Sequence, residues 1–144
     1  MNWIFLLFLT ALFYGSYNIL IKLSSETFHP VGGAVMLQIG AAIVTLAAVI
    51  ILKLSGGTIS WNMQGMRYAL FAGLFVAGAE LASFWLFSRG VQASIGIPLI
   101  IGGSVVTGVL LSIFFLRESI AMRDFLGGGL ILLGIILLSG RHYG

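Results

Sequence analysis

Cysteine is absent from the 144 residues, and charged side chains make up only 8% of them. Without cysteine the chain has no disulfide, no thiolate metal ligand and no cysteine nucleophile. The two histidines, His29 and His142, lie far apart in the sequence and make no zinc or haem pair. Because a soluble domain carries about 25% charged residues, this composition excludes a soluble globular domain.

Hydrophobic residues make up 60% of the chain and fall into five long runs. Runs of about twenty residues cross the ~30 Å hydrocarbon core of a bilayer when they are helical. The sequence therefore predicts an all-α, multi-pass integral membrane protein, surrounded by lipid, with one domain over residues 1–144. The expected transmembrane helices cover about residues 3–23, 31–54, 66–88, 94–116 and 124–140. The basic residues flank these runs, as they do beside lipid headgroups, so the net charge of +3 does not indicate nucleic-acid binding.

One charged side chain, Glu80, lies inside the third run, between Arg67 and Arg89. A charge near the middle of a membrane costs roughly 2.5–3.5 kcal/mol on insertion scales, so it usually has a polar partner, a water-filled cavity or a function. Phe84 and Phe87 follow on the same helical face, which suits a cation or an aromatic substrate but also ordinary packing. The other acidic residues fall in predicted connections: Glu26, Glu118 and Asp124. Glu80 is therefore the first candidate to bind substrate or a proton.

Polar side chains also line one face of the first predicted helix, because they recur every four residues. They are Thr10, Tyr14, Asn18 and Lys22. Such a stripe either forms hydrogen bonds that hold the helices together or makes a wall that faces the substrate, and the sequence leaves both open. In the second interpretation Tyr14 and Asn18, with Gln38 from the next helix, complete a polar lining for substrate or protons.

Small residues predict close helix contacts in the last two helices. Ser104 and Gly108 belong to a row of small residues spaced four apart in the fourth helix. Gly127 and Gly134 lie in the fifth helix, which carries no side chain suited to chemistry. We expect these glycines to serve packing, within the subunit or between two copies.

Five spans would place the two termini on opposite sides of the membrane. Four basic residues then lie on the N-terminal side and three on the other, which is a weak positive-inside bias. This bias permits insertion in both orientations, and two inverted copies could build the pseudo-two-fold arrangement common in secondary transporters. The alternative is a fixed orientation that the charges specify only weakly.

Several motifs resemble those of one family. An aromatic-Gly-Ser start precedes Asn18, His29-Pro30 comes before the second helix, and AxxASFWLFSRGVQAS lies in and after the third. The later motifs are IPLIIGG and FFLRESIAMRDFLGGGLILLGIILLSG. The whole chain thus resembles one five-helix EamA repeat of the drug/metabolite transporter superfamily, with Glu118 and Gly127 as the more specific points. Residues 82–140 are also similar to the last three helices of the small multidrug resistance proteins.

The resemblance implies a transporter of the inner membrane, often an exporter of amino acids, metabolites or organic cations. Most EamA proteins carry two repeats in one chain, so a single repeat implies a homodimer, antiparallel if both orientations occur, or a partner subunit. In the small multidrug resistance family the last helix supplies dimer contacts, a role that Gly127 and Gly134 match. Those proteins carry an essential glutamate in their first helix where this sequence has Tyr14, so their proton-coupling site is not carried over.

Two hypotheses of function remain. In the first, the protein is a secondary transporter coupled to protons or cations, and Glu80 exchanges a proton for a cationic substrate. In the second, it is a membrane subunit or scaffold without transport, in which Glu80 only bonds to a neighbouring polar residue. Half of a heteromeric flippase for lipid-linked sugars is a further alternative. No enzyme, metal or cofactor is expected, because the sequence shows no paired carboxylates, metal-ligand spacing or nucleophile–base pair.

Overall fold

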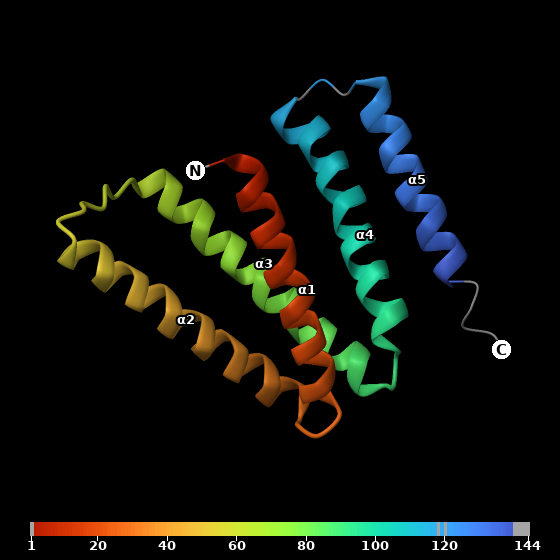
Figure 1. The fold of residues 1–144 in the computed structure, drawn as a ribbon, viewed down its shortest axis with the longest axis horizontal. Helices are drawn as coiled ribbons and strands as arrows, with labels where there is room; N and C mark the ends of the chain where they lie inside the picture. Colours follow the sequence, from red (N-terminus) through yellow and green to blue (C-terminus); the bar gives the residue numbers. More distant parts are fainter. Residues whose placement is uncertain (1, 118, 120, 140–144) are drawn as a thin grey trace. The chain divides into compact units, whose positions relative to one another are not determined.

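The computed structural model describes residues 2–117, 119 and 121–139, which form helices and the connections between them (Figure 1). The five α-helices of this part are α1 (Trp3–Ser25), α2 (Pro30–Leu54), α3 (Met63–Ser88), α4 (Ala93–Leu111) and α5 (Met122–Ser139). A π-helical turn, η1 (Ser112–Leu116), continues α4. Glu118, one of the specific points of the resemblance, lies outside the described residues, and so do Gly140 and the tail that follows it.

Among the described residues, four helical segments are long and apolar enough to cross a membrane. They are Trp3–Ser25, Pro30–Leu54, Met63–Ser88 and Ala93–Leu116, the last of which includes η1. Many of their large apolar side chains are exposed, with Leu54 at 83% and Phe75 at 80%. Helices that expose apolar residues in this way fit a lipid environment rather than water. The predicted multi-pass, all-helical membrane class is confirmed to this extent, whereas a fifth span by α5 stays a prediction.

The chain divides into two compact units. The first consists of Met1–Asn18 and Val91–Gly144, and the second of Ile19–Gly90. The boundary falls within α1, so this helix contributes its first part to the first unit and its last turns to the second.

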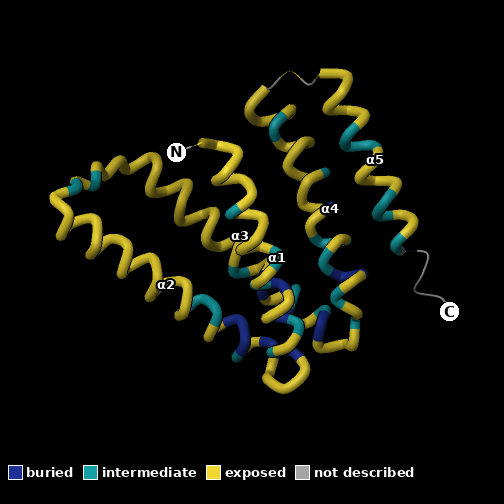
Figure 2. Tube along the Cα trace, viewed as in Figure 1, coloured by how far each residue is buried: buried dark blue, intermediate teal, exposed yellow. Residues whose placement is uncertain are grey.

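In the second unit, α2 and α3 form an antiparallel hairpin whose buried residues gather at one end (Figures 1 and 2). This is the end where α2 begins and α3 finishes. Ala34 of α2 and Phe84 and Phe87 of α3 lie there and are at most 4% exposed. In contrast, α2 is exposed throughout residues 39–54, which Figure 2 shows as an unbroken yellow stretch. The core of this unit is therefore small and lies close to Glu80.

The start of α3 depends on a side-chain cap. Asn62 Oδ1 accepts hydrogen bonds from the backbone N–H groups of Gln64 at 2.9 Å and Gly65 at 3.2 Å. An asparagine at this position satisfies N–H groups that the first helical turn leaves unpaired. The helix consequently begins at Met63 rather than at about residue 66, where the hydrophobic run begins.

In the first unit, α4 packs against α5 at Gly102. A β-carbon built on Gly102 would lie 2.6 Å from Cδ1 of Ile135 and 3.4 Å from Cγ2 of Ile131. Glycine therefore allows these two helices to approach closely. The π-helical turn then ends at Arg117, whose φ of 53° lies in the left-handed region that often terminates helices.

Candidate functional site

Glu80 lies on α3 and is buried, with only 6% of its surface exposed. Phe84 and Phe87 lie one and two turns further along and are 2% and 1% exposed. Positions i, i+4 and i+7 share one face of an α-helix. The carboxyl group therefore belongs to a buried face of α3 that two aromatic rings continue.

The ring of Phe84 packs directly on the backbone of α2. A β-carbon built on Gly33 would lie 2.9 Å from Cζ of Phe84, and other ring atoms would lie closer still. Gly33 and its neighbour Ala34 are both buried. Leu37 and Gln38 follow one turn later on α2 and are half-buried.

Gln38 and Glu80 lie at about the same level of the α2–α3 hairpin. The contact between Gly33 and Phe84 sets the register of these two antiparallel helices. At 1.5 Å per residue, Gln38 lies about 7.5 Å along α2 from Gly33, and Glu80 lies about 6 Å back along α3 from Phe84. Both steps run toward the connection between the helices, so the two polar residues occur at one level.

The amide nitrogen Nε2 of Gln38 is buried and has no hydrogen-bond partner among the residues that the structure describes. A buried N–H group in this condition costs roughly 1–3 kcal/mol, and such groups are rare in native proteins. This level of the hairpin thus offers a carboxyl group, an amide N–H and the nearby ring of Phe84. A carboxylate beside apolar and aromatic surface is suited to a small organic cation.

Tyr14 and Asn18, the other two predicted site residues, belong to the first unit. Asn18 is 3% exposed, and its Nδ2 donates a hydrogen bond to the carbonyl oxygen of Tyr14 at 2.7 Å. Tyr14 is 56% exposed and meets Tyr17 edge to face, with ring centroids 5.5 Å apart. Thr10 likewise donates to the carbonyl oxygen of Leu6 at 2.8 Å. Two members of the polar stripe therefore bond to the backbone of their own helix, and the roles of Tyr14 and Asn18 at a site stay predictions.

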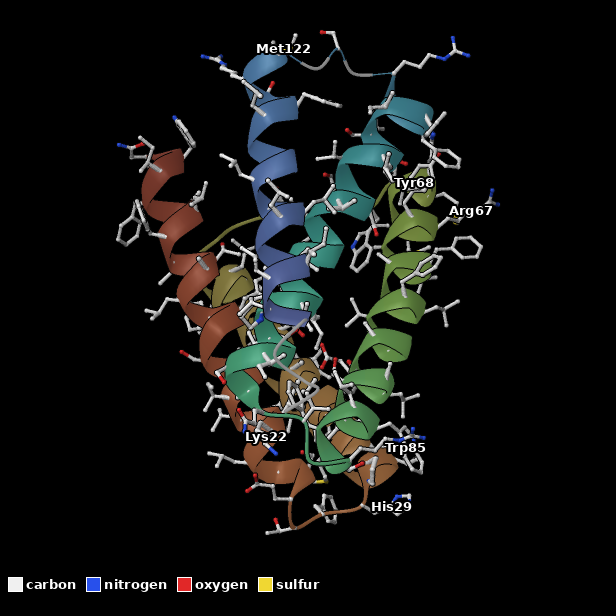
Figure 3. All side chains as sticks on the ribbon, turned by 90° about the vertical axis from the view of Figure 1, so that its right-hand side faces the viewer. Lys22, His29, Arg67, Tyr68, Trp85 and Met122 are labelled. Atoms are coloured by element: carbon white, nitrogen blue, oxygen red, sulfur yellow. The ribbon has the colours of Figure 1, made fainter. Side chains whose placement is uncertain are left out.

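Two contacts at the end of the second unit were not expected from the sequence. The ring of His29 meets Trp85 edge to face, with centroids 6.0 Å apart, and Lys22 pairs with Glu26 at 3.0 Å. Figure 3 shows Lys22, His29 and Trp85 at this end, and Arg67 at the opposite end of α3. Histidine before Pro30 indicated only the start of a helix, so nothing in the sequence pointed to the ring contact. Within the described part of the chain, no group of three or more His, Asp or Glu side chains could hold a metal ion.

The residues predicted for close packing leave open surfaces in the structure. β-Carbons built on Gly108, Gly127 and Gly134 would meet no described heavy atom within 4 Å. The hydroxyl group of Ser104 donates to the carbonyl oxygen of Ile101 at 2.7 Å. Contact of these residues with a second copy of the chain therefore stays a prediction.

Comparison with known proteins gives one family. A profile of the EamA-like transporter family matches residues 1–140. An uncharacterised protein of Methanocaldococcus jannaschii is 33% identical over 131 residues, which cover 91% of each chain. No solved structure matches the chain.

Proposed function

Because the chain belongs to the EamA-like transporter family, we propose that it is a secondary transporter that exports a small organic cation, amino acid or metabolite in exchange for protons or other cations. The family is one of membrane transporters, and the apolar helices make this chain a multi-pass membrane protein. The inner cell membrane is the proposed location. The observation that carries the proposal is the burial of Glu80 beside Phe84, in a helix long enough to span the bilayer.

A single buried carboxyl group is enough for exchange. Its ionised form pairs with a substrate cation, whereas its protonated form is electrically neutral and does not. The proton and the cation therefore compete for the same carboxyl group. When the cation binds, the proton leaves for the aqueous side to which the site is open. Glu80 is the only acidic residue within the four spanning segments, so no other carboxyl group in them can bind the proton and the cation in turn.

Proton movement driven by a cation gradient tests this mechanism. The protein is reconstituted in liposomes that contain a pH-sensitive dye, and quaternary ammonium ions are added outside because they cannot cross lipid as neutral bases. We expect the internal pH to rise as cations enter and protons leave, beyond the change seen in protein-free liposomes. A panel of amino acids is tested in the same way, and if no quaternary ammonium ion and no amino acid moves protons, the exchange mechanism fails.

The working unit is proposed to be a homodimer, antiparallel if the chain inserts in both orientations. Support comes from the open glycine surfaces at Gly108, Gly127 and Gly134, where an added β-carbon would have no described neighbour within 4 Å. The predicted substrate-binding residues Glu80, Gln38, Tyr14 and Asn18 would then occur twice in each assembly.

Orientation is measured with single cysteines, since the chain has none of its own. Thr58 and Ser119 are exposed positions in the two connections on the same predicted side of the membrane. Thr58 is preferable to Gly56, whose φ of 77° would strain any other residue. We expect a membrane-impermeant maleimide to label each position from both sides. Labelling of both positions from one side only would exclude the antiparallel homodimer.

A further inference from the structure

The amide group of Gln38 is a buried donor that the exchange mechanism does not use. We propose that Gln38 determines the specificity of the Glu80 site by donating a hydrogen bond from Nε2 to an acceptor oxygen of the transported cation. This inference rests on the proposed function, because it requires a cation bound at Glu80. It narrows the substrate class to organic cations that carry an ether, hydroxyl, carbonyl or carboxylate oxygen near the positive charge.

The chemistry of the two groups is complementary. An amide nitrogen only donates hydrogen bonds, whereas an ionised carboxylate only accepts them. Nε2 has no partner among the described residues and is shielded from solvent, so a bound molecule with an acceptor would satisfy it. A molecule that lacks the acceptor leaves the N–H buried and unpaired, and it therefore binds less tightly.

The register of the α2–α3 hairpin limits the distance between the positive charge and the acceptor oxygen of the substrate. Gln38 and Glu80 differ by only about 1.5 Å along the helix axes, and the axes of packed helices lie about 8–10 Å apart. Both side chains extend from facing helices, so a molecule held by both is short. A cationic nitrogen separated from an oxygen by two carbon atoms has the required size.

Two ammonium ions that differ in one atom provide the test. (2-Phenoxyethyl)trimethylammonium has an ether oxygen where (3-phenylpropyl)trimethylammonium has a methylene group, and both carry a permanent charge. Their dissociation constants are measured by titration calorimetry on the purified protein, on Gln38→Leu and on Glu80→Gln. Gln64→Leu is the matched control, because Gln64 is an exposed glutamine of the same unit. Gln38→Met replaces Gln38→Leu if the leucine variant does not fold.

We expect the affinity of the ether, relative to that of its methylene analogue, to fall about tenfold in Gln38→Leu and to stay unchanged in Gln64→Leu. If Gln38 only positions Glu80, its replacement weakens both ions equally, and the unchanged ratio overturns the inference while the proposed function stands. Two results contradict a cation site at Glu80, and the inference with it. In the first, neither ion binds the unaltered protein; in the second, Glu80→Gln binds both ions as tightly as the unaltered protein does.

Discussion

Replacing Glu80 by glutamine is expected to abolish cation-driven proton release, reducing it to the level of protein-free liposomes. Glutamine matches the size of glutamate and still accepts a hydrogen bond, but it carries neither a negative charge nor an acidic proton that it can release. Exchange needs one group that holds the cation and the proton in turn. No other carboxyl group lies within the four spanning segments, so none can replace Glu80.

Glu26→Gln provides the matched control. Glu26 is an acid of the same unit that directly follows α1. Its side chain is 51% exposed and pairs with Lys22 in the last turn of that helix. Because the carboxylate of Glu26 is accessible to water, although the Lys22 side chain is only 16% exposed, we expect the pair to contribute about 0–1 kcal/mol. We expect Glu26→Gln to transport at a rate close to that of the unaltered protein. Equal loss of transport in both variants would show that charge in general, and not the buried carboxyl group, is required.

Thermal stability separates the transporter from the scaffold hypothesis. If Glu80 serves exchange, Glu80→Gln should lose transport while its melting temperature stays within a few degrees of the unaltered protein. If Glu80 serves only to bond neighbouring helices, the variant should melt earlier, and neither protein should move protons. Preserved pH-dependent transport in Glu80→Gln would contradict the exchange mechanism.

The membrane class and the candidate acid could be predicted from the sequence because the bilayer constrains both strongly. A spanning helix needs about twenty apolar residues, so Trp3–Ser25 and Pro30–Leu54 are visible as hydrophobic runs. A charge within such a run is expensive, and Glu80 is therefore conspicuous among only four acidic residues. The cap at Asn62 was not part of that prediction, because the hydrophobic run alone placed the start of the third helix at about residue 66, whereas α3 begins at Met63.

The facing surfaces of the helices could not be predicted in the same way. α2 is apolar on all sides apart from a few residues, so its hydrophobic pattern does not indicate which face packs against α3. The contact between Gly33 and Phe84, and hence the shared level of Gln38 and Glu80, depends on the rotation of both helices about their axes. The π-helical turn before Arg117 is a second example, since no proline or glycine marks its position.

Gly33→Ala is expected to lower the free energy of unfolding by about 2 kcal/mol, because the added methyl group would overlap the ring of Phe84. The ring is 2% exposed and has little space into which to move. Unfolding is followed by circular dichroism during titration with dodecyl sulfate. Gly40→Ala is the control, because Gly40 lies on the same helix with no described heavy atom within 4 Å of the added carbon. This control should be unchanged or up to about 1 kcal/mol more stable.

Gly33→Ala should also slow transport, although Gly33 has no side chain that could take part in it. Displacing the Phe84 ring moves α3 relative to α2, and Glu80 lies one turn away on the same face as Phe84. In Gly33→Ala/Phe84→Leu the smaller side chain leaves room for the methyl group, so we expect more than half of the lost stability to return. If Gly33→Ala and Gly40→Ala unfold alike, the two helices do not pack at Gly33. The common level of Gln38 and Glu80 would then lose its structural basis.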